Sequence, residues 1–254
     1  RDEDYKAHDR SENTYILPSV NAKIKPFKWL SFLLAYSQTI SRPEYYAYMP
    51  RFSYSTVGGD ISNIGNPKVK PGLSHNFDAY VTLNANNTNL PNWLGVFTAG
   101  AFHKKIIGLE WNKLFIILND SSNRYQPYYK LLGITDTHLD FRVFINNPIP
   151  TYTKGIELEW QSSFWSLPKP FNGIVINANF TLTESEFSQV DEYKKVTPIP
   201  GQPPFLWPVE ARDTVKVTPL FDAPRYTVNV TLGYDFKGFS ARFSYKHNSE
   251  SFNS

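Results

Sequence analysis

The stretch Gly173–Ser185, with the sequence GIVINANFTLTES, alternates apolar and polar residues along its length. Its apolar residues share one face of an extended strand, because successive side chains of a strand point to opposite sides of a sheet. The stretch Thr153–Trp165, TKGIELEWQSSFW, shows the same pattern, with Ile156 and Leu158 on the apolar face. Strands of about 9–11 residues with one apolar face have the length that crosses a bilayer at a tilt. The pair therefore predicts two neighbouring strands in the wall of an outer-membrane β-barrel.

Six further stretches alternate in the same way, so eight strands are expected in all. They are Tyr15–Lys25, Trp29–Ile40, Ser74–Asn84, Leu94–Lys104, Tyr226–Asp235 and Phe239–His247. The connections between the strands alternate strictly between short and long along the chain. Antiparallel hairpins then bring the short turns to one rim and the long loops to the other, as in outer-membrane barrels. The predicted fold class is all-β, an antiparallel transmembrane β-barrel with long extracellular loops.

Aromatic residues lie beside the short turns. Trp29, Trp93, Trp165 and Phe239 each lie within a few residues of one. Amphipathic rings suit the headgroup level of a membrane, although aromatic residues are also common in strands of every kind. We favour an interfacial girdle at the rim that the short turns form.

The three long connections are expected to stand outside the membrane. They are Ser41–Leu73, Lys105–Tyr152 and Glu186–Arg225. The second contains strand-like pieces at Leu114–Leu118 and Phe141–Ile145, which predict hairpins above the bilayer. The end of the third, Lys195–Pro224, carries seven of the 19 prolines. Proline removes a backbone donor, so this part is predicted to be an extended surface loop without regular strands.

The composition limits the classes of protein to which the chain can belong. Its 254 residues carry a net charge of +3 and no basic run, which gives no support for nucleic-acid binding. Cysteine is absent, so disulfides and thiol nucleophiles are excluded. No apolar run approaches the length of about 18 residues that a transmembrane helix needs. The chain opens with the polar Arg1–Asp4, so we expect that a leader was removed or that the start of the protein lies upstream.

Four short motifs stand at the junctions between expected strands and loops. They are SQTISRP at 37–43, GNPKVKP at 65–71, AFHKKI at 101–106 and GIELEWQ at 155–161. In these motifs, and in their order, the chain resembles the TonB-dependent outer-membrane receptors. The resemblance extends from Leu17 to about His247, and it departs from the usual pattern at Val69, Gly72 and His103.

The resemblance implies how the chain is organised. Receptors of this family have a barrel of about 22 strands around an N-terminal plug domain, and a short TonB box precedes the plug. Nothing in residues 1–254 resembles the plug, the TonB box or the final strands that end at an aromatic residue. The whole chain is therefore expected to be part of the β-barrel domain, a stretch of about eight strands from its second half.

The resemblance also implies a function. Such receptors lie in the outer membrane of Gram-negative bacteria, bind a scarce nutrient at their extracellular loops and import it with energy that TonB transmits. The ligand is of the siderophore, cobalamin or glycan type. The implied partners are TonB, acting through the missing N-terminal part, outer-membrane lipid and lipopolysaccharide, and the small-molecule or glycan ligand, but no nucleic acid.

Candidate ligand contacts lie in the long connections, where aromatic and arginine side chains make good anchors. Tyr45, Tyr46 and Tyr48 form one group, and Arg124 and Tyr125 belong to a second. Each of these residues could instead pack one loop against another, and both interpretations fit the sequence.

Glu157, Glu159 and Arg242 are expected to face the lumen, because they stand on the polar side of their strands. The two glutamates are about 7 Å apart by strand rise, between the carboxylate spacings of the two glycosidase classes. No sugar-binding arrangement surrounds them, so we interpret them as charges in a watery lumen. The five histidines show no metal-ligand spacing. No catalytic residue, metal site or cofactor is therefore predicted, and the chain is not expected to be an enzyme.

Two alternatives of other classes stay open. One is a passive porin-like barrel or an outer-membrane barrel enzyme, which the presence or absence of an upstream plug would separate from a receptor. The other is a secreted β-sandwich with glycosylation sequons at Asn86, Asn179 and Asn229. The sandwich is disfavoured because Asn179 and Asn229 fall inside expected strands.

Overall fold

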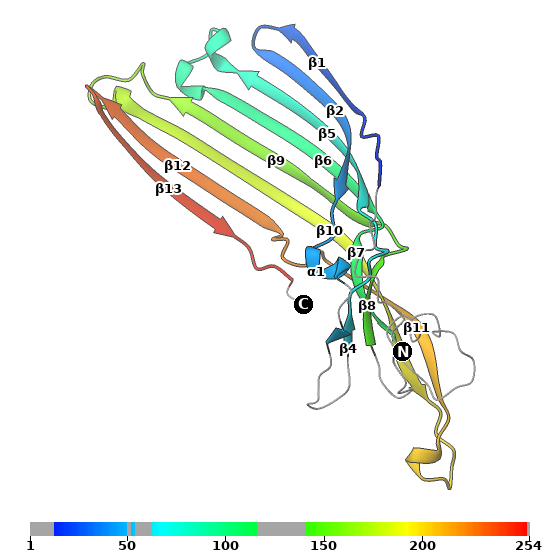
Figure 1. The fold of residues 1–254 in the computed structure, drawn as a ribbon. Helices are drawn as coiled ribbons and strands as arrows, with labels where there is room; N and C mark the ends of the chain where they lie inside the picture. The colour runs from blue at the N-terminus through cyan, green and yellow to red at the C-terminus, as the bar shows by residue number, and fades with distance from the viewer. Residues whose placement is uncertain (1–12, 50–51, 54–61, 116–140, 253–254) are drawn as a thin grey trace.

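A computed structural model describes residues 13–49, 52–53, 62–115 and 141–252 of the chain. Its main feature is a curved antiparallel sheet whose strands lie side by side in the order β1-β2-β5-β6-β9-β10-β12-β13 (Figure 1). Their bounds are Ser19–Phe27 (β1), Leu30–Ser41 (β2), Gly72–Asn84 (β5), Val96–Ile107 (β6), Thr151–Ser163 (β9), Ile174–Val196 (β10), Tyr226–Phe236 (β12) and Phe239–Asn248 (β13). The predicted all-β antiparallel fold is thus confirmed.

The strand register gathers the alternating apolar side chains onto one face of the sheet, here called the apolar face. Ala79 on β5 stands opposite both Leu34 and Ala101, and Leu158 on β9 stands opposite both Ala99 and Phe180. Side chains on this face remain uncovered in the chain itself: Leu34 is 54% exposed and Phe243 is 66% exposed. A continuous, uncovered apolar surface over eight strands is the surface that a bilayer covers.

The opposite face of the sheet, here called the polar face, carries the hydrogen-bonding residues. Asn229 on β12 donates to Asn179 on β10 at 2.6 Å, and the hydroxyls of Thr82 and Thr98 lie 3.1 Å apart across β5 and β6. Polar side chains therefore satisfy one another across neighbouring strands.

All four short connections lie at one end of the sheet, and the long ones lie at the other (Figure 1). The β12–β13 turn has only Lys237 and Gly238 at its centre, with φ of 46° and 84°. Positive φ at both central residues is the signature of a type I′ hairpin turn, whose twist matches that of the flanking strands. The 85–95 connection contains two 3₁₀ turns, Ala85–Asn87 and Asn92–Leu94, and the β9–β10 connection contains one at Phe171–Gly173.

At the other end, the long connections build a second, smaller assembly, here called the loop assembly. It contains a short helix and a four-stranded sheet in the order β3-β4-β8-β7. The elements are α1 (Tyr45–Tyr48), β3 (Phe52–Ser53), β4 (Ser62–Ile64), β7 (Glu110–Phe115) and β8 (Phe141–Asn146). Strands β7 and β8 pair antiparallel, close to the expected strand pieces, although residues 116–118 lie outside the described part of the chain.

The interpretation of Lys195–Pro224 as a loop without regular strands is wrong. Strand β11 (Val209–Thr218) lies within it and pairs antiparallel with the far half of β10, from Phe187 to Val196. The prolines gather in the tip of this hairpin and just after β11, and β11 itself contains none. Proline is excluded from the ladder and not from the turn beside it, so a high local proline count did not exclude a strand. The tip includes a 3₁₀ turn at Pro204–Leu206.

Buried apolar residues are concentrated in the loop assembly, because no second layer covers either face of the main sheet within the described residues. Ala47, Val69 and Phe144 form one buried cluster. Phe187 is also buried and packs edge-on against the half-buried Trp111, with ring centroids 5.2 Å apart. None of the helices in the described part of the chain is long and apolar enough to cross a membrane.

Candidate functional site

The two glutamates of β9 stand on the polar face and already accept hydrogen bonds. The hydroxyl of Tyr80 on β5 donates to Oε2 of Glu157 at 2.8 Å, and the amide of Gln161 donates to Oε1 of Glu159 at 2.5 Å. Tyr80 reaches Glu157 by passing over β6 at Gly100, which stands between them in the register. A Cβ at Gly100 would lie 2.2 Å from the tyrosine ring, so only glycine leaves room for this crossing.

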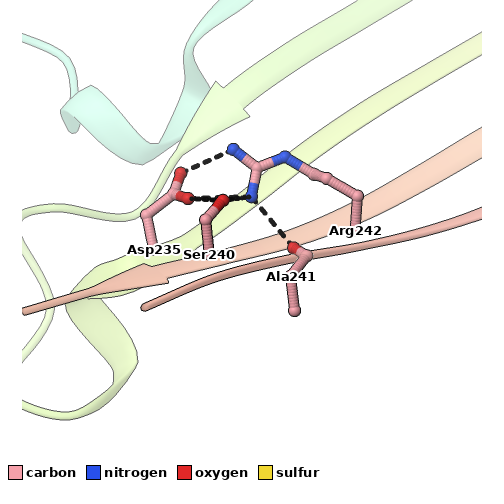
Figure 2. Close-up of polar contacts among 4 residues, drawn as sticks. All are labelled: Asp235, Ser240, Ala241 and Arg242. Atoms are coloured by element: carbon pink, nitrogen blue, oxygen red, sulfur yellow. Dashed lines mark hydrogen bonds and ion pairs between the residues drawn. The ribbon is translucent and has the colours of Figure 1, made fainter. Parts of the chain in front are cut away.

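Arg242 stands on the polar face near the β12–β13 turn, where its guanidinium binds within its own hairpin (Figure 2). It makes a bidentate pair with Asp235, with N–O distances of 2.9 and 2.7 Å. It also donates to Ser240 Oγ at 3.2 Å and to the carbonyl of Ala241 at 2.9 Å. The side chain lies over Gly233, where a Cβ would come within 2.8 Å of it. A fork-to-fork pair of this kind fixes the geometry of the hairpin.

The structure separates the three clustered tyrosines of the first long connection. Tyr45 is 80% exposed. Tyr46 packs edge-on against Phe144, with ring centroids 5.2 Å apart, and Tyr48 packs against the buried cluster of the loop assembly. Tyr45 is therefore the member of the group that offers a free ring surface. Arg124 and Tyr125 lie outside the described residues.

Gly65 and Asn66, from the GNP motif, hold helix α1 in place. The backbone amide of Asn66 donates to the carbonyl of Ala47 at 2.7 Å, and its side-chain amide donates to the carbonyl of Phe144 at 2.8 Å. A Cβ at Gly65 would lie 1.7 Å from the carbonyl oxygen of Met49. The motif thus joins α1 to β8, and its glycine allows the two backbones to touch.

Residues that the sequence did not single out dock the loop assembly onto the far half of β10. The indole of Trp111 donates to the carbonyl of Val190 at 3.0 Å, and the backbone amide of Leu114 donates to Asp191 at 2.8 Å. Lys113 forms an ion pair with Asp213 of β11 at 3.0 Å. These partners are 77–100 residues apart in sequence, so no local pattern could have revealed them.

A second contact beside α1 involves an ionisable side chain, that of Glu110. The backbone amide of Glu44 donates to both carboxylate oxygens of Glu110, at 3.2 and 3.3 Å. Burial raises the pKa of Glu110 above its ordinary value of 4.5, and the Glu44 amide offsets only part of that increase. Burial, and then the charge of Glu110, likewise raise the pKa of the Tyr48 hydroxyl.

The raised pKa of Glu110 predicts a pH dependence for the seating of α1. The folded state holds this proton more tightly than the unfolded state does, so the contribution to stability is complete below pH 4.5 and is lost as the pH rises through the raised pKa. Amide hydrogen exchange of residues 44–49, corrected for intrinsic rates, should show protection that falls over this window. Glu110→Gln should remove the dependence, while Glu250→Gln, at an exposed position, should keep it. A protection that rises with pH in the native protein would contradict the assignment.

Within the described residues, no group of three or more His, Asp or Glu side chains could hold a metal ion. The described residues present a polar sheet face and a loop assembly with an exposed tyrosine, Tyr45.

Comparison with known proteins gives one match to a family and several to solved structures. Residues 1–254 match the family model described as TonB dependent receptor-like, beta-barrel. No curated protein matches the chain. Three of the solved structures are receptors from different bacteria.

The siderophore receptor PirA from Acinetobacter baumannii aligns with 14% identity and a TM-score of 0.55, over 91% of this chain and 28% of its own. The R480A mutant of the ferric enterobactin receptor PfeA from Pseudomonas aeruginosa, in complex with enterobactin, gives 15% identity and a TM-score of 0.54, over 92% and 28%. A double mutant of the hemophore receptor HasR from Serratia marcescens, in complex with its hemophore HasA and heme, aligns with 13% identity and a TM-score of 0.56. The alignment covers 91% of this chain and 32% of that receptor. The chain thus spans about a third or less of these receptors, and at such identities the likeness concerns the fold alone.

Proposed function

Because this chain belongs to the TonB-dependent receptor-like β-barrel family, we propose that it is part of an outer-membrane receptor that imports a scarce nutrient with energy transmitted by TonB. The observation that carries the proposal is the match over the full 254 residues, joined to an apolar face that runs across eight strands. The solved receptors of the same fold are named for siderophores, ferric enterobactin and heme. We therefore place a ligand of the siderophore type first, ahead of cobalamin or a glycan.

We propose that residues 1–254 form one segment of a larger barrel. The order of the described sheet begins at β1 and ends at β13, so the sheet is open at both edges. An open edge in hydrocarbon leaves backbone N–H and C=O groups unpaired, at a cost of several kcal/mol each, about 2–7 by transfer measurements. Strands from the rest of the protein then complete the ladder, and a plug domain fills the space beside the polar face, where Glu157, Glu159 and Arg242 stand.

The loop assembly is the proposed place of ligand capture. It stands at the end of the sheet opposite the short turns (Figure 1), and Tyr45 projects from it with most of its surface free. Aromatic side chains supply large contact areas at small entropic cost, which makes an exposed ring a good anchor for a ligand. No chemical step is needed.

The orientation can be tested by labelling single cysteines, since the chain has none of its own. Gln202→Cys, at the tip of the β10–β11 hairpin, should react with an impermeant maleimide on whole cells. Ser166→Cys, in the β9–β10 turn, should react only after the outer membrane is opened. Labelling of Ser166→Cys on intact cells, with Gln202→Cys protected, would reverse the topology.

The function can be tested by uptake of radioactive iron from ferric enterobactin and from heme, using the full-length receptor in a host without other receptors for them. Import by the native protein should vanish when TonB is deleted. Tyr45→Ala should weaken the apparent affinity about tenfold, the effect of a loss of about 1–2 kcal/mol at an anchor residue, with little change in maximal rate. Tyr245→Ala, on the apolar face of β13, is the matched control and should leave import unchanged. Import that persists without TonB would favour a passive pore.

A further inference from the structure

The loop assembly lies against the polar face at the outer end of the sheet. Four polar-face positions at the outer ends of neighbouring strands are buried: Ser74, Ile106, Thr151 and Phe187. Trp111 of β7 covers Phe187, with ring centroids 5.2 Å apart. On the opposite face, the next residues of β6 and β9, Ile107 and Tyr152, are 43% and 36% exposed. The assembly therefore bends inward, over the space that the polar face borders.

The chain enters and leaves the loop assembly at the outer ends of four neighbouring strands, β2, β5, β6 and β9. The pairing of β6 with β9 ends at Ile106 and Thr151, and the pairing of β7 with β8 begins at Glu110 and Asn146. Three residues of one chain stand there against four of the other, and Gly108 among them has a φ of 69°. An extra residue in a ladder interrupts the pairing and bends the ribbon. These links form a hinge line along one side of the assembly.

On its other side the loop assembly touches the β10–β11 hairpin through three contacts, here called the latch. They run from Trp111 to Val190, from Leu114 to Asp191 and from Lys113 to Asp213, at 3.0, 2.8 and 3.0 Å. Within the part of the chain that the structure describes, no strand of the assembly pairs with β10 or β11. A contact without a ladder opens at a smaller cost than the paired strands on either side of it. The latch is thus the place where the assembly separates most easily from the sheet.

The seat of Trp111 is built from segments outside the loop assembly. Phe187 of β10 and Phe221 of the β11–β12 connection lie 5.9 Å apart, and Trp111 packs parallel to Phe221 at 6.1 Å. Phe252, which follows β13, lies 5.4 Å from Phe221. The two rings of the seat hold each other whether or not the tryptophan is present. A seat of this kind is what a latch that opens and closes requires.

From the inward bend, the hinge line and the seat, we infer that the loop assembly is a flap over the outer mouth of the lumen. It is latched at Trp111 in the structure described here, and it swings away from β10 when the nutrient enters. The exposed ring of Tyr45 stands on the same assembly, so the flap carries the proposed capture site with it. The inference rests on the proposed function, since it concerns how a nutrient reaches the lumen.

The first test measures how often the flap opens, and it needs no ligand. In the full-length receptor on whole cells, a cysteine replaces Thr153, the next residue after Thr151 on the polar face of β9. Its reaction with an impermeant maleimide should be slow, and about tenfold faster with Trp111→Ala, because the rate follows the population of the open state. Asp213→Asn, at a side chain that is 64% exposed, removes only the ion pair and should raise the rate about threefold. The matched control is Trp207→Ala, whose indole bonds within the hairpin tip, and it should leave the rate unchanged.

The second test asks whether import requires the opening. Lys113→Cys and Asp213→Cys, joined by a reducible bismaleimide, hold the latch shut. Import of iron from ferric enterobactin or heme should then fall to about a tenth or less, and it should recover when the crosslink is reduced. Lys195→Cys and Glu210→Cys, register partners within the β10–β11 hairpin, are the control pair and should leave import unchanged when they are joined.

Two outcomes would overturn the flap. Equal labelling of Thr153→Cys with and without Trp111→Ala would mean that the assembly is a fixed roof. Unchanged import with the latch joined would mean that the nutrient enters by another route. A native receptor that imports neither compound contradicts the proposed function, while the labelling rates still decide whether the flap opens. Heat-modifiable migration on gels shows that each variant is folded.

Discussion

Replacing Phe180 by Arg should lower the free energy of unfolding in a bilayer by about 2–4 kcal/mol relative to Phe180→Ala. Phe180 lies near the middle of the membrane-facing part of β10, opposite Leu158 on β9 and Val228 on β12. A guanidinium there must be buried in hydrocarbon or must drag water and headgroups toward the midplane. Neither neighbouring side chain offers it a partner, so the cost is not offset.

The matched control is Thr181→Arg, the next residue of the same strand. Thr181 stands on the polar face, opposite Glu157 and Thr227. An arginine there meets a carboxylate and should cost less than about 1 kcal/mol. Both variants can be measured in the full-length protein by urea unfolding in lipid vesicles. Equal losses at the two positions would mean that the two faces of the sheet have been assigned wrongly.

Gly95→Ala should lower the free energy of unfolding by about 3 kcal/mol, for a reason different from that of Phe180→Arg. Gly95 has a φ of 65°, a conformation that side chains oppose, and an added Cβ would lie 2.0 Å from the carbonyl oxygen of Gln161. That oxygen belongs to the backbone of β9 and cannot rotate away. Relief requires the 85–95 connection to move, which would disturb the hydrogen bond from the Trp160 indole to the carbonyl of Leu94, now 2.8 Å long.

Gly201→Ala separates the cost of backbone strain from the cost of a steric clash. Gly201 also has a positive φ, 83°, but nothing lies within 4 Å of the position that its Cβ would take. Gly201→Ala should therefore lower the free energy of unfolding only by the cost of the backbone conformation, about 1 kcal/mol. The same vesicle unfolding assay reports both variants. If Gly95→Ala and Gly201→Ala lost the same amount, the contact with Gln161 would not be the cause.

The sequence predicted the membrane part of the fold well because a bilayer forces a simple rule on every strand. One face must be apolar, so a period of two is visible for as long as the strand is in contact with lipid. The rule stops where the strand leaves the membrane. From Glu184 onward β10 mixes polar and apolar residues on both faces, and the alternation that marked Ile174–Leu182 disappears although the strand runs on to Val196. The second half of β10 is held by its pairing with β11. Neither segment alone shows a sequence pattern that predicts this pairing.

The candidate site was only partly predictable, for a related reason. The tyrosine cluster at 45–48 was visible, but the turn of α1 decides that Tyr45 points outward while Tyr46 meets Phe144. The bridge from Tyr80 to Glu157 joins residues 77 positions apart across an intervening strand. Such pairs depend on register, and register is set by the whole sheet.

The length of β10 decides which part of the described chain an agent outside the cell would touch first. Its 23 residues make a rod of about 75 Å at the rise of a strand, and the hairpin with β11 occupies the last ten of them. In Figure 1 the hairpin projects away from the sheet, on the side of the long connections. In the proposed orientation its proline-rich tip is therefore the first part of the described chain that an antibody or a bacteriophage would touch. Change at Pro203–Leu206 could then alter recognition by such agents while the strands in the membrane stay as they are.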